Sequence, residues 1–323
     1  MEIFTSTLNQ MLLMFLLIFV GILLRKSKIL PEDSGTTLSK LELYALTPAL
    51  NFHNWAQNCT LDTLTQNTKL ILYGAIMVGI AIALAYPLSK LFVRNSSQSA
   101  ELDYQRNIYK YAMTFGNYGY VGNYIILSVF GSAMFFRYSM FNFIVGFVCS
   151  SWGLYILAPK RENGKQSVND VLKRFFTPPV IAMLLGALVG LTNTKQFIPD
   201  FIMNAASNAG DCMGPIAMIL AGFVVGAYDF KEMLGKKKVY VAALLRLIVI
   251  PAVFMLVLHL VGIEKDIMTL ALITFATPLG MNTIVYPAAY GQDTQTGASM
   301  TMISTAFSVI TIPLMYLVFI VLL

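Results

Sequence analysis

The sequence predicts an all-α membrane protein in which ten transmembrane helices form two inverted five-helix repeats, with helices 4 and 9 broken. Three observations support this fold class. The chain of 323 residues is 57% hydrophobic and 12% charged, whereas soluble domains carry about 25% charged residues. Its basic residues gather in alternate loops, and two of its apolar segments are interrupted at corresponding places in the two halves.

Ten apolar segments approach the length of about 20 residues that a bilayer-spanning helix needs. They cover residues 6–25, 36–56, 68–93, 107–130, 133–157, 176–192, 200–227, 239–261, 267–290 and 296–322. The second segment carries Lys40 and Glu42 in its first turns, and we expect both side chains to reach the membrane interface. The longest polar stretches, 95–106 and 160–173, are too short to bury a core of their own.

The basic residues predict an orientation, because loops rich in Lys and Arg stay on the cytoplasmic side. Sixteen fall in one set of loops, while Lys69, Lys195 and Lys265 fall in the other, with Arg137 near an outer segment end. The sixteen are Arg25, Lys26, Lys28, Lys90, Arg94, Arg106, Lys110, Lys160, Arg161, Lys165, Lys173, Arg174, Lys231, Lys236, Lys237 and Lys238. This pattern predicts a multi-pass protein of the cell membrane with extracytoplasmic N- and C-termini. Since these charges serve topology, the formal net charge of +6 does not indicate nucleic-acid binding.

The two halves of the chain match when it is divided near its middle. Pro48 in the second segment precedes Pro215 in the seventh by 167 residues, and Asn117 in the fourth precedes Asn282 in the ninth by 165. Order, residue type and offset agree, although coincidence among Pro- and Gly-rich membrane helices is the alternative. Five segments per half is an odd number, so the second half must run inverted. The predicted divisions are a first repeat at 1–158, a cytoplasmic linker at 159–175 and a second repeat at 176–323.

The fourth and ninth segments are each interrupted near the middle. The first interruption reads Thr-Phe-Gly-Asn-Tyr-Gly-Tyr-Val-Gly-Asn over 114–123, and the second reads Thr-Phe-Ala-Thr-Pro-Leu-Gly-Met-Asn over 274–282. Glycine permits non-helical backbone, and Pro278 lacks an N–H and disfavours helix at the preceding residue. Hydrocarbon cannot satisfy the freed backbone groups, so such a break survives only inside protein or beside a wet cavity. Matching breaks in two halves are typical of the binding site of a secondary transporter.

These interruptions predict which residues bind a solute. If the two extended stretches cross, two half-helix N-termini face one point, each with about half a positive charge and unpaired N–H donors. That point would hold an anion, and side-chain amides there could donate and accept hydrogen bonds. The predicted substrate-binding residues are Asn51, Asn117, Tyr118, Gly119, Asn123, Pro278, Gly280, Asn282 and Thr283. The alternative is that the asparagines only satisfy the broken backbone.

Three ionisable side chains lie within the predicted membrane segments, and the sequence leaves more than one role possible for each. Asp211 lies within the seventh segment, where a carboxylate is a candidate coupling residue that carries a proton, and an interhelical hydrogen bond is the alternative. Arg246 could pair with Asp211 or with helix C-terminal carbonyls, or it could extend to the inner surface, and we favour the last of these. For His53 we favour an interfacial position over a role in proton coupling.

Sequence patterns of other function classes are absent. The sequence contains no His-Glu-x-x-His, no Walker sequence and no Gly-x-Ser-x-Gly, so we expect neither an enzyme nor a nucleotide-driven pump. Cys59, Cys149 and Cys212 show no metal-ligand spacing and are expected to fill apolar space. We therefore predict no cofactor and no metal, and energy would come from ion or solute gradients.

Several of these stretches resemble the auxin efflux carrier family. Residues 115–122 are similar to its Gly-Asn-x-Gly-Phe-x-Gly segment, and further matches follow at 47–50, 210–217, 246–251, 276–282, 290–291, 304–305 and 312–313. The resemblance spans nearly the whole chain and implies ten helices in two inverted repeats, crossed helices 4 and 9, and a transport domain that rocks or moves like an elevator. Bacterial members of the family include permeases for malate, malonate and similar organic acids. One departure is Gly122-Asn123-Tyr124, where the family usually has Gly-x-Pro, and the added amide could alter substrate choice.

The sequence thus predicts a secondary carrier of small organic anions, such as mono- or dicarboxylates, that works across the cytoplasmic membrane by alternating access. One alternative is a sodium-coupled symporter of organic solutes like the bile-acid carriers, with Na⁺ held by Asp211 and unwound carbonyls. Another is a transporter-like membrane sensor. The expected partners are the organic anion and the lipid bilayer. The coupling ion, H⁺ or Na⁺, and the formation of a homodimer stay open.

Overall fold

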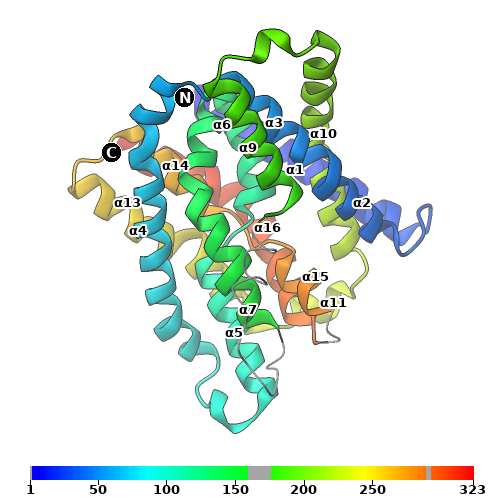
Figure 1. Ribbon diagram of the computed structural model, residues 1–323. Coiled ribbons are helices and arrows are strands. Elements are labelled where there is room, and N and C mark those ends of the chain that lie inside the picture. Colours follow the sequence, from blue (N-terminus) through cyan, green and yellow to red (C-terminus); the bar gives the residue numbers. More distant parts are fainter. Residues whose placement is uncertain (1, 159–175, 289–291) are drawn as a thin grey trace, which may run out of the picture.

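A computed structural model describes residues 2–158, 176–288 and 292–323, and all regular secondary structure within these ranges is helical (Figure 1). The first half contains α1 (Glu2–Lys26), α2 (Ser34–Leu41), η1 (Glu42–Leu46), α3 (Thr47–Asn58), α4 (Leu61–Phe92), η2 (Ser96–Gln98), α5 (Ala100–Thr114), η3 (Tyr118–Gly122), α6 (Asn123–Val148), η4 (Cys149–Gly153) and α7 (Leu154–Leu157). Labels with η mark 3-10 or π turns. The predicted linker at 159–175 and the matched pair at 290–291 lie outside the described residues.

The second half also contains long and interrupted helices. It contains α9 (Pro178–Leu191), η5 (Lys195–Phe197), α10 (Asp200–Val225), α11 (Phe230–Leu234), α12 (Lys237–Leu244), η6 (Leu245–Val249), α13 (Ile250–Leu260), α14 (Lys265–Ala276), α15 (Asn282–Ala288), α16 (Gln295–Tyr316) and η7 (Leu317–Leu322). Figure 1 shows the two chain ends towards the same end of the molecule, with the connection between α4 and α5 at the opposite end. This placement is compatible with an even number of crossings.

Six helical stretches of the described chain are long and apolar enough to cross a membrane. They are Leu8–Lys26, Leu61–Phe92, Ala100–Leu157, Asp200–Val225, Lys237–Leu260 and Gln295–Leu322. The stretch Ala100–Leu157 has 58 residues, more than twice the length of about 20 that one crossing takes. It is interrupted after Thr114 and turns again at Gly131, whose φ of 81° lies outside the helical region. The sequence-predicted fourth and fifth segments meet at this second turn.

The outer faces of several helices are apolar, as expected for contact with lipid. Leu16 on α1, Leu72 on α4 and Leu188 on α9 are about 60% exposed, at 61%, 62% and 59%. In α9 only Met183 and Gly186 are buried among the fourteen residues. A soluble protein does not expose large continuous apolar faces, so these helices indicate a multi-pass membrane protein.

Small residues let the helices approach closely at two similar contacts. A Cβ on Gly222 of α10 would overlap the carbonyl of Ile18 on α1, and a Cβ on Gly186 of α9 would lie 2.5 Å from the carbonyl of Phe52 on α3. Helices in membranes associate through such close packing, because lipid leaves little hydrophobic drive between them. The helices α9 and α10 also pack against η1.

One sequence-based expectation is wrong at this place. Glu42 lies in the π turn η1 and is fully buried, at 0% exposure, whereas we expected it at the membrane interface. Its neighbour Lys40 is exposed. The helices α9 and α10 pack against η1, and tertiary packing of this kind is not revealed by the local sequence.

Candidate functional site

The two interrupted segments meet inside the protein. The first opens after Thr114 of α5 and resumes at Tyr118 in η3, and the second opens after Ala276 of α14. The backbone N–H of Asn117 donates to the carbonyl of Pro278 at 2.6 Å, so one interruption bonds directly to the other. The N–H of Leu279 donates to Ser304 Oγ of α16 at 2.9 Å. Backbone groups released by the breaks are therefore partly satisfied within the protein, as hydrocarbon surroundings require.

Gly116 stands where the two interruptions are closest. A Cβ at this position would overlap the Thr277 hydroxyl and the Arg246 guanidinium, and it would lie 2.7 Å from the Thr277 carbonyl. These neighbours are backbone and buried side chains, so they cannot move aside easily. Glycine is thus required here by close approach.

We predict that Gly116→Ala destabilises the protein by about 1–3 kcal/mol, because the added methyl group overpacks a filled site. Thermal unfolding of the detergent-purified variant measures this effect. Gly119→Ala is the matched control, since a Cβ at Gly119 meets nothing within 4 Å in the same interruption. Equal unfolding temperatures for the two variants would contradict the packing described for Gly116.

A polar cluster lies beside this junction, around Asn282 at the start of α15. The Asn282 Nδ2 donates to Tyr111 Oη at 2.8 Å and lies 3.8 Å from Cys149 Sγ. Tyr111 Oη and Cys149 Sγ are themselves 3.2 Å apart, and the Tyr118 hydroxyl also interacts with this thiol. Asn282 is exposed whereas Tyr111 and Cys149 are buried. The amide of Asn282 is therefore fixed by the buried Tyr111 and Cys149 side chains, while the residue itself remains exposed.

Cys149 and Tyr111 were missed by the sequence analysis. We expected Cys149 to fill apolar space, and it does lie in the buried hydrophobic core, but its thiol also contacts the polar cluster. It lies in the π turn η4, which faces the start of α15. The available signal was a tyrosine and a cysteine within otherwise apolar segments. The sequence does not tell toward which neighbours these side chains point.

Arg246 bonds to the C-terminal ends of α5 and α14, the helices that precede the two interruptions. Its guanidinium donates to the carbonyls of Met113 and Thr114 at 3.5 and 3.3 Å and to the carbonyl of Thr274 at 3.5 Å. The residue is 2% exposed, so the favoured extension to the inner surface is wrong. The structure instead matches the alternative of pairing with helix C-terminal carbonyls, where the helix dipole favours a positive charge.

The second part of α6 holds both interruptions in place. Tyr138 Oη donates to the Tyr118 carbonyl at 3.1 Å, and Asn142 Nδ2 donates to Thr274 Oγ1 at 3.0 Å. The sequence analysis did not select these two residues. Their spacing of four residues in an apolar segment places them on one helix face, and this was the signal that could have found them.

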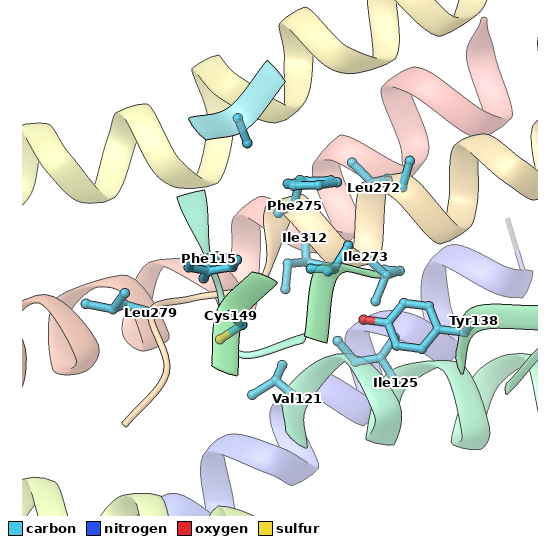
Figure 2. Close-up of a cluster of buried hydrophobic side chains, with 14 of the residues drawn as sticks. Phe115, Val121, Ile125, Tyr138, Cys149, Leu272, Ile273, Phe275, Leu279 and Ile312 are labelled. Atoms are coloured by element: carbon cyan, nitrogen blue, oxygen red, sulfur yellow. The ribbon is translucent and has the colours of Figure 1, made fainter. Parts of the chain in front are cut away.

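Apolar side chains surround the junction. Figure 2 shows Phe115 and Leu279, one from each interruption, in one buried cluster with Val121, Ile125 and Phe275. Phe115 and Leu279 are 1% and 2% exposed. Hydrogen bonds in such a dry environment are stronger than in water, and unpaired polar groups are more costly. The bonds of Asn117, Asn282 and Arg246 therefore define the local structure.

The remaining predicted site residues divide between the junction and other places. Gly280 packs against Asn117, because a Cβ on it would lie 3.5 Å from the Asn117 Cα, and the Thr283 hydroxyl donates to the Gly280 carbonyl at 3.3 Å. Asn117 is 8% exposed. Pro278, Gly280 and Thr283 are buried, and Tyr118, Gly119 and Asn123 are half-buried.

Asn51 and Asp211 are placed differently from the junction residues. Asn51 Nδ2 donates to the Pro179 carbonyl at 3.1 Å, so this side chain forms a hydrogen bond between α3 and α9. Asp211 is exposed on α10, and His53 of α3 is half-buried within electrostatic range of it. Among the described residues, no group of three or more His, Cys, Asp or Glu side chains could hold a metal ion.

Nearly the whole chain matches one family of known proteins. The family model described as "Membrane transport protein", the model of the auxin efflux carrier family, matches residues 6–316, nearly the whole chain. The chain belongs to this family. The motif-based resemblance to auxin efflux carriers is thereby confirmed.

One similar protein supports the same assignment. The chain is 24% identical over 314 residues to a protein described as an uncharacterized transporter of Methanocaldococcus jannaschii. The alignment covers 95% of this chain and 97% of the relative. Family membership indicates a transporter and is consistent with the prediction that the chain is not an enzyme.

Proposed function

We propose that this member of the family is a secondary carrier that moves small organic anions, such as mono- or dicarboxylates, across the cytoplasmic membrane. The observation that carries the proposal is the junction of the two interruptions, where Asn117 bonds to Pro278 and the exposed amide of Asn282 lies beside it. An amide can donate two hydrogen bonds to a carboxylate without adding a net charge. Neutral donors of this kind bind an anion and still allow its release.

Ten crossings in two inverted repeats, 1–158 and 176–323, form the proposed architecture. Matched packing supports it. When the halves are superimposed in order, α1 corresponds to α9 and α3 corresponds to α10. The contact of α1 with α10 therefore corresponds to the contact of α9 with α3. The contacts of α4 with α6 and of α12 with α16 correspond in the same way. The proposed movement is an elevator-like alternation around the junction, with both termini extracytoplasmic.

The membrane potential is a sufficient driving force for one direction of this transport. Moving one elementary charge is worth about 2.3 kcal/mol per 100 mV, so export of an anion from a cell that is negative inside can proceed on potential alone. Buried apolar side chains, including Phe115 and Leu279, line the junction.

Sodium coupling is the second candidate, and one observation disfavours it. Unwound backbone carbonyls would have to coordinate Na⁺, but the carbonyls at the ends of α5 and α14 already accept hydrogen bonds from Arg246. A fixed guanidinium supplies the positive charge that Na⁺ would bring to these helix ends. We therefore expect anion transport to be independent of Na⁺.

A thermal-shift screen of the purified protein tests this function. We expect a carboxylate substrate to raise the unfolding temperature, because a ligand at 100 times its Kd stabilises the folded protein by about 2.7 kcal/mol. Malate, malonate and monocarboxylates are compared with and without Na⁺, and ligands that stabilise are then tested for flux into proteoliposomes. Stabilisation without flux would favour a sensor, and stabilisation that needs Na⁺ would favour the symporter.

A further inference from the structure

Glu42 is a carboxylate buried inside the membrane domain with little to stabilise its charge. It is 0% exposed, and its Oε1 has no hydrogen-bond partner in the described part of the chain. Its Oε2 accepts one long hydrogen bond, of 3.4 Å, from the Thr47 hydroxyl. Buried carboxylates normally have several donors or a cation. Glu42 is not part of the anion site proposed above, so its burial needs a separate reason.

No cation compensates this carboxylate among the described residues. The titratable or charged residues on the helices packed against η1 are Lys40 of α2, His53 of α3, and Asp200, Asp211 and Cys212 of α10. None of them forms an ion pair with Glu42 within the described ranges. Removing a lone charge from water is very unfavourable, so a buried carboxyl group of this kind is best accommodated with its proton bound. Its O–H can then donate a hydrogen bond, which an ionised group cannot.

The position of Glu42 connects it to the anion site. Tyr120 in η3, three residues beyond Asn117, lies within electrostatic range of Glu42. The helix α10 packs against both η1 and η3, and a Cβ on its Gly214 would overlap the ring of Tyr124. A change of charge at Glu42 would therefore act on the segment that carries Asn117.

The local backbone also favours a role in movement. Glu42 begins the π turn η1, which lies between α2 and α3 within one predicted membrane segment. A π turn has one residue more than an α-helical turn, and such turns are frequent at functional sites. Relaxation of this turn to regular helix would rotate Glu42 relative to its surroundings.

We propose that Glu42 is the proton-binding carboxylate of this carrier. Its carboxylate takes up H⁺ from one side of the membrane, forming the neutral acid, and the O–H bond breaks to release H⁺ on the other side during the transport cycle. Proton and anion movements are coupled because both change the contacts of η1 and η3. The inference rests on the proposed carrier function, and it gives the coupling role to Glu42 in place of Asp211, whose side chain is exposed.

The first test is transport of radiolabelled malate by Glu42→Gln in proteoliposomes. We expect uptake driven by a pH gradient to fall about tenfold or more, while malate–malate exchange at equal pH persists, because glutamine keeps the shape but cannot release a proton. Glu32→Gln is the matched control, since that side chain is 88% exposed and should leave both activities unchanged. Loss of the pH-driven uptake in Asp211→Asn but not in Glu42→Gln would overturn the proposal.

The second test needs no substrate. Infrared difference spectra between wild type and Glu42→Gln should contain the C=O band of a protonated carboxyl group at neutral pH, and this band should disappear in strongly alkaline buffer. An ionised Glu42 at neutral pH, seen as a missing band, would overturn the proposal. If wild-type protein moves no malate, the proposed function fails for this anion, and the infrared band still decides whether Glu42 holds a proton.

Discussion

Asn117→Ala and Asn282→Ala are each expected to abolish anion flux in proteoliposomes while leaving the fold intact. The reason is that each removes a neutral amide from the junction of the two interruptions, where the backbone of Asn117 bonds to Pro278 and Asn282 is fixed by Tyr111. Losing a hydrogen bond to a charged ligand group costs about 1.5–3 kcal/mol, which corresponds to a loss of affinity of roughly 10- to 150-fold. Initial rates of radiolabelled anion uptake measure the effect.

The two asparagines also allow binding to be separated from folding. Asn117 uses its backbone N–H for the bond to Pro278, so alanine retains that bond and should keep the unfolding temperature of the wild type. Asn282→Ala leaves the buried Tyr111 hydroxyl with one partner fewer and should unfold at a slightly lower temperature. Asn95→Ala serves as control, because Asn95 is exposed beyond the end of α4. Wild-type flux in both junction variants would exclude this location for the anion.

The helical segments and the two interruptions could be predicted because they depend on local chemistry. Segment length and apolar composition are read directly from the chain, and Gly116, Gly119 and Pro278 mark backbone that cannot continue as a regular helix. The contact between the interruptions was predicted only conditionally, from the matched places of Asn117 and Asn282. The bond from Asn117 to Pro278 now shows that the two stretches touch.

The two wrong expectations concern side chains in the same kind of turn. Glu42 and Arg246 both lie in π turns, η1 and η6, and both are buried, whereas we expected Glu42 at the membrane interface and Arg246 at the inner surface. A π turn inserts a residue and changes which side chains face inward after it. Its position cannot be read from sequence here, because lipid-facing and core-facing sides of these helices are both apolar and give little helical periodicity. Only the packing of other helices shows where these side chains point.

Arg246→Met is expected to lower the free energy of unfolding by about 3–5 kcal/mol and to abolish transport. Methionine keeps much of the volume but leaves the carbonyls of Met113, Thr114 and Thr274 without their shared donor in a buried place. The C-terminal ends of α5 and α14 would then face each other with uncompensated partial negative charges. Thermal unfolding in detergent and anion uptake in proteoliposomes measure the two effects.

Chemical rescue separates a positioning role of this charge from simple packing. In Arg246→Ala, added guanidinium ion should raise the unfolding temperature and restore part of the flux, because it can occupy the vacated place and donate to the same carbonyls. Arg246→Lys should retain some function, since one ammonium group keeps the charge but reaches fewer carbonyls at once. Arg94→Met is the control, as Arg94 is exposed after α4. Rescue by Na⁺ as effective as rescue by guanidinium would instead identify these helix ends as a cation site and restore the sodium-coupled alternative.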